Sequence, residues 1–87
     1  MNDLKIIVRL LYAIEAGQGK PVFDISLVDE RVLKATAEGR DRIALQLRDA
    51  GYITGLKTLE GIDNMDRTVI LWNKSHPEVT LEGLTYM

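Results

Sequence analysis

The stretch TAEGRDRIALQLRDAGYI, residues 36–53, decides the fold. Thr36 is a suitable helix N-cap, because its hydroxyl can accept a hydrogen bond from an unpaired amide in the first helical turn. Apolar side chains follow it with helical spacing and predict a buried stripe of Ile43, Ala44, Leu47 and Ala50. Gly51 then stands where a helix commonly ends in a left-handed residue. The stretch therefore predicts a capped amphipathic helix that leads directly into a strand.

Two helices are predicted before this stretch. Residues 3–16 carry apolar side chains with helical spacing, and residues 27–33 carry enough of them for a helix of about two turns. Only the few residues around 34–36 separate the second helix from the third, as in a helix-turn-helix. Residues 20–23 lie between the first two helices and are predicted to supply a short extended strand.

A hairpin is predicted after the stretch. Residues 52–59 are rich in threonine and apolar residues and predict one strand, in which Gly55 marks a bulge or a close approach of another backbone. A polar loop spans residues 60–66. Residues 68–72, TVILW, are apolar on both faces, which predicts a central strand with Trp72 in the core.

The end of the sequence predicts a linker and a last helix. Residues 73–78 are predicted to be the linker, and Thr80 is a suitable N-cap for a helix with Leu81 and Leu84 facing inwards. This helix has barely two turns before Met87. We therefore expect either a frayed last helix or a natural chain that continues past this residue.

The order of these elements is helix, short strand, helix, helix, strand, strand, helix. It predicts the α+β fold of a winged helix-turn-helix, with three helices, a small antiparallel sheet with a β-hairpin wing, and a short C-terminal helix. A sequence of 87 residues with 46% hydrophobic and 28% charged residues suits one globular domain, which we place at residues 1–87.

Several classes of protein are disfavoured by composition. There is no cysteine, which excludes disulfides, thiol catalysis and cysteine-bound zinc. The apolar N-terminal segment contains Lys5 and Arg9 and lacks a cleavage pattern, so a signal peptide is not predicted. No run reaches the roughly 18 apolar residues of a membrane span. We expect a soluble, cytoplasmic protein with no membrane partner.

No pattern typical of a catalytic site is present. His76 is the single histidine and precedes a proline, and its neighbour Ser75 does not make a triad, which depends on spatial proximity. The segment GQGK, residues 17–20, lacks the full spacing of a phosphate-binding loop. We therefore expect a protein that is not an enzyme, with no cofactor, no metal and no small-molecule substrate.

The sequence resembles a known family. The residues that carry the resemblance are Ala50-Gly51-Tyr52-Ile53, the glycine at 55, and Thr80-Leu81-x-Gly83-Leu84-x-Tyr86. Together they look like the YjcQ family, small winged-helix proteins of bacterial and prophage genomes that are largely uncharacterised. The resemblance covers nearly the whole chain. It implies a winged-helix fold and a module similar to a transcription regulator, without an established activity.

Duplex DNA is one expected partner. A winged helix places its second motif helix in the major groove and its wing on the backbone. The candidate DNA contacts are Arg40, Arg42 and Arg48 on that helix, with Lys57 and Arg67 on the hairpin. The charges argue against this function, because the net charge is −2 and the outward face of the helix is mixed. The predicted wing is acidic, with Glu60, Asp63 and Asp66.

The alternative is a protein–protein interaction or dimerisation module. The first helix is apolar over an unusually wide arc, which indicates either coverage by its own domain or a dimer seam. The candidate interface residues are Ile6, Leu10 and Leu84. Ile62 and Met65 at the wing tip, with Leu45 on the third helix, are apolar where exposure is expected, and such clusters mark interaction surfaces.

Overall fold

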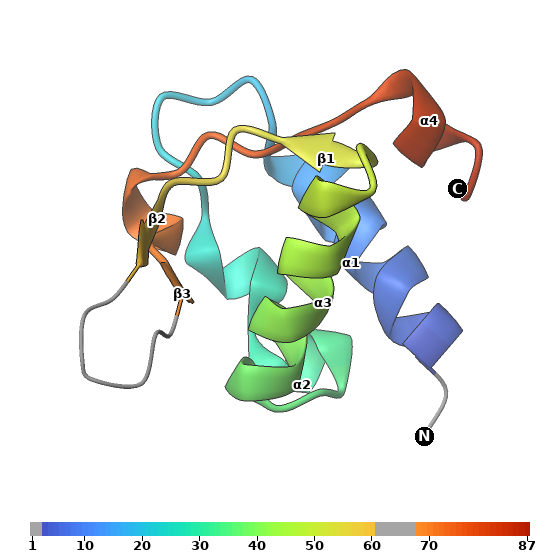
Figure 1. Ribbon diagram of the computed structural model, residues 1–87, viewed down its shortest axis with the longest axis horizontal. Helices are drawn as coiled ribbons and strands as arrows, with labels where there is room; N and C mark the ends of the chain where they lie inside the picture. Colours follow the sequence, from blue (N-terminus) through green and yellow to red (C-terminus); the bar gives the residue numbers. More distant parts are fainter. Residues whose placement is uncertain (1–2, 61–67) are drawn as a thin grey trace.

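Two helices form the centre of the molecule (Figure 1). The structure is a computed structural model that describes residues 3–60 and 68–87. Helix α1 spans Asp3–Gly17 and contacts α3, Ala37–Asp49. Their inward residues are the middle of the hydrophobic core, which includes Ile6, Leu10, Leu11, Ile14, Ile43, Ala44 and Leu47. The chain forms a compact α+β domain, in which the described residues contain four α-helices and two small antiparallel sheets.

The predicted limits of α3 are confirmed. The Thr36 hydroxyl accepts a hydrogen bond from the amide of Gly39 at 3.0 Å. Gly51 has a φ of +84°, the left-handed conformation expected after a helix. The prediction for Ala50 is wrong: it is exposed, because α3 ends at Asp49 and Ala50 lies in the cap turn beyond the packed face.

The predicted second helix is divided into two short pieces. A 3-10 turn, η1, spans Ile25–Val28, and α2 spans Glu30–Leu33. Asp29 separates them because its carboxylate accepts a hydrogen bond from the amide of Arg31 at 2.8 Å, which starts a new helix. The short turn before α3 is as predicted, and it begins at Lys34 with a φ of +56°.

The strands form a hairpin with a four-residue interruption. Strand β1, Ile53–Thr54, pairs with β4, Glu78–Val79, and β2, Thr58–Glu60, pairs with β3, Thr68–Ile70. The pairs Thr54–Glu78 and Thr58–Ile70 show that the return strand holds four more residues between them than the outgoing strand. These residues enclose the 3-10 turn η2, Trp72–Lys74.

Gly55 and Ser75 explain how the hairpin accommodates the four extra residues. A Cβ atom at Gly55 would clash with the carbonyl group of His76, so the predicted close backbone approach is confirmed. The Ser75 hydroxyl accepts from the amide of Lys57 at 2.9 Å and donates to the carbonyl of Leu71 at 2.7 Å. The extra residues carry Trp72 into the core, where it is 3% exposed, as predicted.

Three predictions for the strands are wrong. Residues 20–23 do not form a strand. Instead β4, which begins at Glu78, the last residue of the predicted linker 73–78, pairs with β1. Gln18 contributes to this arrangement, because its side-chain oxygen accepts from the amide of Val79 at 3.1 Å. The strand predicted at 68–72 is not central, since β3 pairs only with β2 in the described residues. Its apolar residues instead divide between the core and an exposed face.

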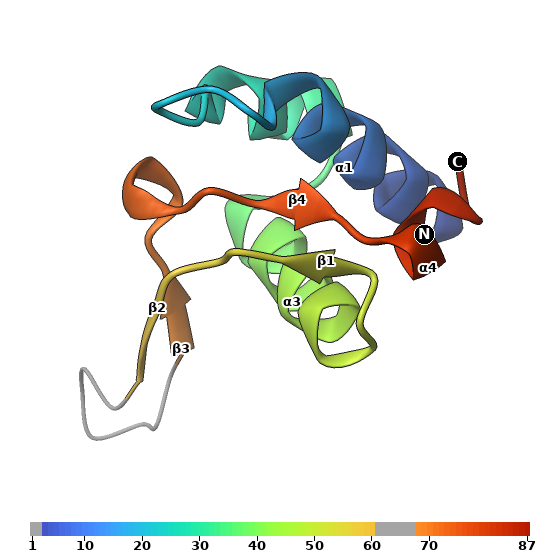
Figure 2. The same cartoon turned by 90° about the horizontal axis from the view of Figure 1, so that it is seen from above.

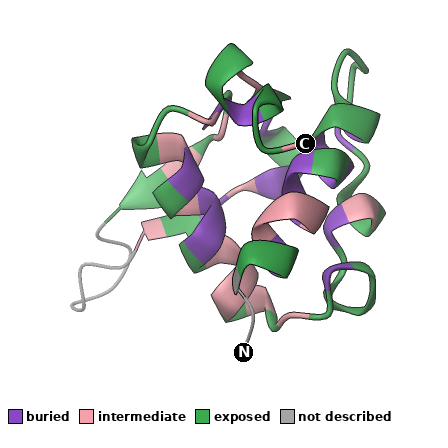
Figure 3. Cartoon of the chain, turned by 90° about the vertical axis from the view of Figure 1, so that its right-hand side faces the viewer, coloured by how far each residue is buried: buried purple, intermediate pink, exposed green. Residues whose placement is uncertain are grey.

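Helix α4, Leu81–Leu84, packs at the C-terminal end of α3. Figure 2 shows β4 on the α1 side of the strand pair and β1 on the α3 side, with α4 following β4. Thr80 caps α4 as predicted, accepting from the amide of Gly83 at 3.1 Å. The inward placement of Leu81 and Leu84 is wrong: Gly83 meets the backbone of Tyr52, and both leucines lie exposed. Figure 3 shows buried residues on the longer helices and in the segments packed around them; eight of the fourteen buried hydrophobic residues belong to α1 and α3.

Candidate interaction surface on helix α3

The outward face of α3 is mixed in charge. The residues that form it are Glu38, Arg42, Leu45 and Asp49, spaced along one side of the helix. The first and last of them are acidic and exposed, Arg42 is exposed, and Leu45 is half-buried. An acid at each end of a helix face disfavours phosphates there, because contacts between cations and phosphates dominate affinity for DNA.

Arg40, one of the candidate DNA contacts, is held inside the domain. Its side chain is 13% exposed and its Nε donates to Asp41 Oδ1 at 2.8 Å. The guanidinium also donates to the carbonyl of Val28 at 3.2 Å and lies over the ring of Trp72, 5.4 Å from the centroid. An arginine with these partners is not available to a phosphate, and its stem covers the core.

Trp72 and Asp41 connect the hairpin to α3. The indole Nε1 of Trp72 donates to Asp41 Oδ1 at 2.9 Å, the same oxygen that accepts from Arg40. Phe23 extends this cluster, with its ring centroid 5.9 Å from that of Trp72. A buried N–H group needs such a partner, so this contact fixes where the hairpin leaves the body of the domain.

The remaining candidate cations differ in availability. Arg48 forms an ion pair with Asp49 at 3.0 Å. Arg42 and Lys57 are exposed, and neither forms an ion pair with an acid in residues 3–60 or 68–87. Arg67, together with the predicted tip residues Ile62, Asp63, Met65 and Asp66, lies outside the described residues.

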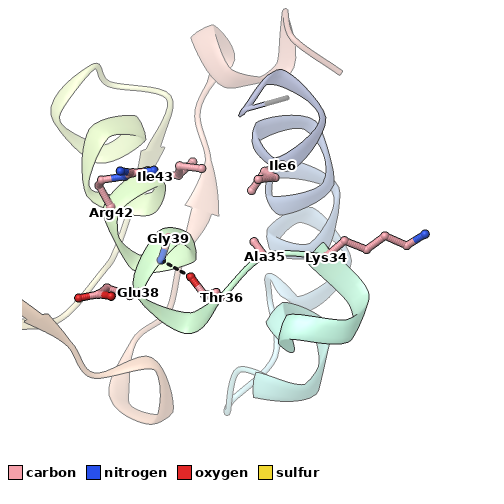
Figure 4. Close-up of a pocket in the computed structure, with 8 residues that line it drawn as sticks. All are labelled: Ile6, Lys34, Ala35, Thr36, Glu38, Gly39, Arg42 and Ile43. Atoms are coloured by element: carbon pink, nitrogen blue, oxygen red, sulfur yellow. Dashed lines mark hydrogen bonds between the residues drawn. The ribbon is translucent and has the colours of Figure 1, made fainter. Parts of the chain in front are cut away.

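A groove lies between α1, the turn after α2 and the N-terminal half of α3. Its volume is about 540 Å³. The residues that line it are Ile6, Lys34, Ala35, Thr36, Glu38, Gly39, Arg42 and Ile43. Figure 4 shows Ile6 on α1 across the groove from α3, with the Lys34 side chain extended outwards. We call this the α1/α3 groove. Ile6 and Ile43 line it but are only 3% and 2% exposed, Arg42 stands beside Glu38, and Lys34 lines it with its side chain directed away from α3.

Sequence reasoning missed Lys34. The sequence predicts the residues around 34–36 only as a connection between helices, whereas the structure places this lysine beside the groove, exposed, as the left-handed C-cap of α2. The signal available in the sequence was its position, because the turn of a helix-turn-helix lies beside the start of the second helix.

A second groove lies between α3 and the hairpin, on the side of α3 away from α1 (Figure 1). Its volume is about 490 Å³. It is lined by Ala37, Glu38, Asp41, Arg42, Leu45, Thr68 and Val69. Apolar atoms of Leu45 and Val69 lie there beside two carboxylates, so this α3/β3 groove is less suited to phosphates than the α1/α3 groove.

The predicted protein-interface residues lie in different environments. Ile6 and Leu10 are 3% and 0% exposed and belong to the core of their own domain. The wide apolar arc of α1 is therefore covered from within, and these two residues do not offer a partner surface. Leu84 is 45% exposed on α4 and remains accessible.

Of the two side chains considered for catalysis, the Ser75 hydroxyl has structural partners. Ser75 is 1% exposed, and its hydroxyl accepts a hydrogen bond from the amide of Lys57 and donates one to the carbonyl of Leu71. His76 is exposed, and its amide donates to the carbonyl of Gly55. No group of three metal-ligating side chains occurs among the residues that the structure describes. Within the same ranges, no helix has the length and apolar character needed to cross a membrane.

A comparison with protein-family models, curated proteins and solved structures finds no match for this chain. The resemblance to the YjcQ family therefore stays a prediction from the sequence.

Proposed function

We propose that this chain is a winged helix-turn-helix domain. The succession of α2, a short turn and α3 supports the helix-turn-helix, and the β2–β3 hairpin beside α3 supports the wing. The resemblance to the YjcQ family agrees with this assignment. The proposal also accounts for the Trp72–Asp41 contact, which orients the hairpin relative to α3.

We further propose that the domain binds duplex DNA and has no catalytic activity of its own. One observation carries this proposal: Lys34 and Arg42 are exposed on the rim of the same groove at the N-terminal end of α3. The N-terminal end of a helix is positive and favours anions, and the N-terminal residues of a recognition helix contact base edges. Arg42 has the geometry to contact guanine or a phosphate.

The same charges predict weak binding. Glu38 lies beside Arg42, and Arg40 is withdrawn into the domain. If Lys34 and Arg42 each neutralise one phosphate, the logarithm of the association constant should fall with the logarithm of salt concentration with a slope of about −2. A slope of this size distinguishes a two-cation surface from the larger basic face of most DNA-binding domains.

The test is a fluorescence anisotropy titration of a mixed-sequence duplex at several salt concentrations. Arg42→Ala should weaken binding and reduce the magnitude of the slope by about 1. Lys20→Ala is the matched control, since it removes an exposed cation from the loop after α1 and should change neither quantity. The DNA proposal is abandoned if the native domain shows no binding at low salt, or if both variants behave alike.

A protein partner is the second candidate, and the α3/β3 groove favours it. This groove combines Leu45 and Val69 with the carboxylates of Glu38 and Asp41, a surface suited to an apolar segment that carries a basic residue. Glu38→Gln separates the two candidates by the sign of its effect. Loss of this carboxylate should strengthen binding to DNA and weaken binding to a basic protein segment.

A further inference from the structure

Strand β2 has an open edge. Within residues 3–60 and 68–87 it pairs with β3 alone. In Figure 2, β3 lies on one side of β2, and no other described helix or strand lies on its other side. The open edge of a sheet presents backbone N–H and carbonyl groups to which a further strand can bind.

The backbone of Thr58 and Glu60 is directed towards this open edge. The amide of Leu71 donates to the carbonyl of Lys57 at 2.8 Å, in the register of the β2–β3 ladder. Because consecutive residues of an antiparallel strand bond alternately towards its two edges, Lys57 and Leu59 bond towards β3. The N–H and carbonyl groups of Thr58 and the N–H group of Glu60 therefore point away from β3.

The side chains along the edge combine one apolar position with two opposite charges. Leu59 is 47% exposed and lies opposite Val69, which is 37% exposed, on the outer face of the hairpin. Lys57 and Glu60 are both exposed. Since side chains alternate between the faces of a strand, Lys57 shares the face of Leu59, and Glu60 lies on the other face. An added strand therefore meets a different chemistry at each of these positions.

This pattern specifies the sequence of a matching antiparallel strand. Directly opposite residues share a face and interact, so the best match places a basic residue opposite Glu60, an apolar residue opposite Leu59 and an acidic residue opposite Lys57. Read from its N-terminus, such a strand is basic, apolar, unrestricted and acidic. A second copy of β2 does not match, because pairing two copies about Thr58 places Lys57 opposite Leu59, and pairing them about Leu59 places Glu60 opposite Thr58.

We propose that the open edge of β2 binds an extended segment of another protein that carries this basic, apolar, unrestricted, acidic sequence. The segment adds to the hairpin as a third, antiparallel strand. Backbone hydrogen bonds to Thr58 and Glu60 supply affinity, and the side chains opposite Leu59 and the two charges supply specificity. The contact is small and belongs to the class of weak interfaces. It does not depend on the cations that carry the DNA proposal.

The test is a titration of the isotope-labelled chain, without DNA, followed by its amide chemical shifts. The probe is a synthetic peptide whose central residues are arginine, valine, threonine and glutamate, in that order, added to about 2 mM. The amides of Thr58 and Glu60 should shift downfield and saturate as they gain hydrogen bonds. The amide of Leu59 should shift less, because it is already directed to β3.

Two methylated peptides separate strand addition from other binding. N-methylation of the peptide threonine, which lies opposite Thr58, removes the donor to the Thr58 carbonyl and should weaken binding about tenfold. N-methylation of the peptide valine is the matched control. Its N–H points away from β2, so this peptide should bind as the unmodified one does.

Charge exchange tests the assigned register. Lys57→Glu and Glu60→Lys should each weaken binding by about two- to fivefold, as expected for an exposed ion pair. The double variant should instead prefer a peptide in which arginine and glutamate are exchanged. Lys20→Glu is the control, because it changes an exposed cation in the loop after α1 and should leave binding unchanged.

Three results would overturn the proposal. They are an absence of shifts at Thr58 and Glu60 at the highest peptide concentration, equal binding of the two methylated peptides, and equal binding of the two charge arrangements by the native chain. Far-ultraviolet circular dichroism establishes that each variant is folded. Since DNA is absent from the titration, its outcome and that of the anisotropy experiment are independent.

Discussion

The indole N–H of Trp72 donates a hydrogen bond to Asp41 Oδ1 at 2.9 Å, and this contact joins the hairpin to α3. The same oxygen accepts from Arg40, whose guanidinium lies over the indole ring. Arg40 and Asp41 of α3 and Trp72 of η2 thus form one polar cluster at the place where the hairpin is interrupted. Any surface formed by α3 and the hairpin together depends on this cluster for its shape.

Asp41→Ala should lower the free energy of unfolding by about 1–3 kcal/mol, because it leaves a buried indole N–H without its acceptor. Thermal unfolding followed by circular dichroism measures this as a lower midpoint. Asp49→Ala is the control, since it removes an aspartate from an exposed pair with Arg48 and should change stability little. Equal effects of the two substitutions would show that the Trp72 contact is not stabilising.

Arg40→Ala and Arg42→Ala should separate stability from binding. Arg40 is 13% exposed and supports Trp72 and Val28, so its loss should lower the unfolding midpoint without changing the salt slope of DNA binding. Arg42 is exposed, so its loss should reduce the slope and leave the midpoint nearly unchanged. Thermal unfolding and anisotropy on the same two proteins measure both quantities. A loss of slope in Arg40→Ala would contradict the assignment of this residue to the interior.

Local signals predicted α1 and α3 well. The Thr36 cap, the apolar stripe and Gly51 all act within a few residues, and the structure has each of them in its expected place apart from Ala50. The helical and strand elements could therefore be predicted wherever the deciding interactions lie close in sequence.

The errors occur where residues far apart in sequence decide the structure. The partner of β1 is set by the four-residue interruption around Trp72, which shifts the pairing and brings Glu78–Val79 to Ile53–Thr54. Arg40 is less exposed than Arg42 because it is bonded to Asp41 and lies over the ring of Trp72. Composition does not indicate these contacts. Lys34 lies beside the groove because it is the left-handed C-cap of α2, a conformation that the sequence pattern does not predict.

Gly55→Ala should destabilise the domain more than Gly19→Ala. Both glycines have a positive φ, +86° and +82°, so each substitution strains the backbone, at a cost of order 1–3 kcal/mol. Only at Gly55 would the new Cβ also clash with the carbonyl group of His76, whereas the space at Gly19 is open. Urea unfolding of the two variants measures the difference. Equal losses would show that the approach of the two hairpin strands at Gly55 is relaxed at little cost.

The contact between Tyr52 and Tyr86 predicts that the docking of α4 weakens at alkaline pH. The hydrogen bond to the Tyr86 hydroxyl, and the repulsion that follows ionisation of both groups, raise the pKa of Tyr52 above its usual value near 10. A phenol whose pKa is raised on folding stabilises the native state below the unfolded pKa, and this contribution is lost as pH rises through the folded value. Absorbance titration of the phenolates should therefore show one tyrosine ionising later than in the Tyr86→Phe variant. Amides of α4 should also exchange faster above pH 10 in the native chain. If the two tyrosines left in the Tyr86→Phe variant ionise over the same pH range as the three of the native chain, the tyrosine pair does not hold α4 in place.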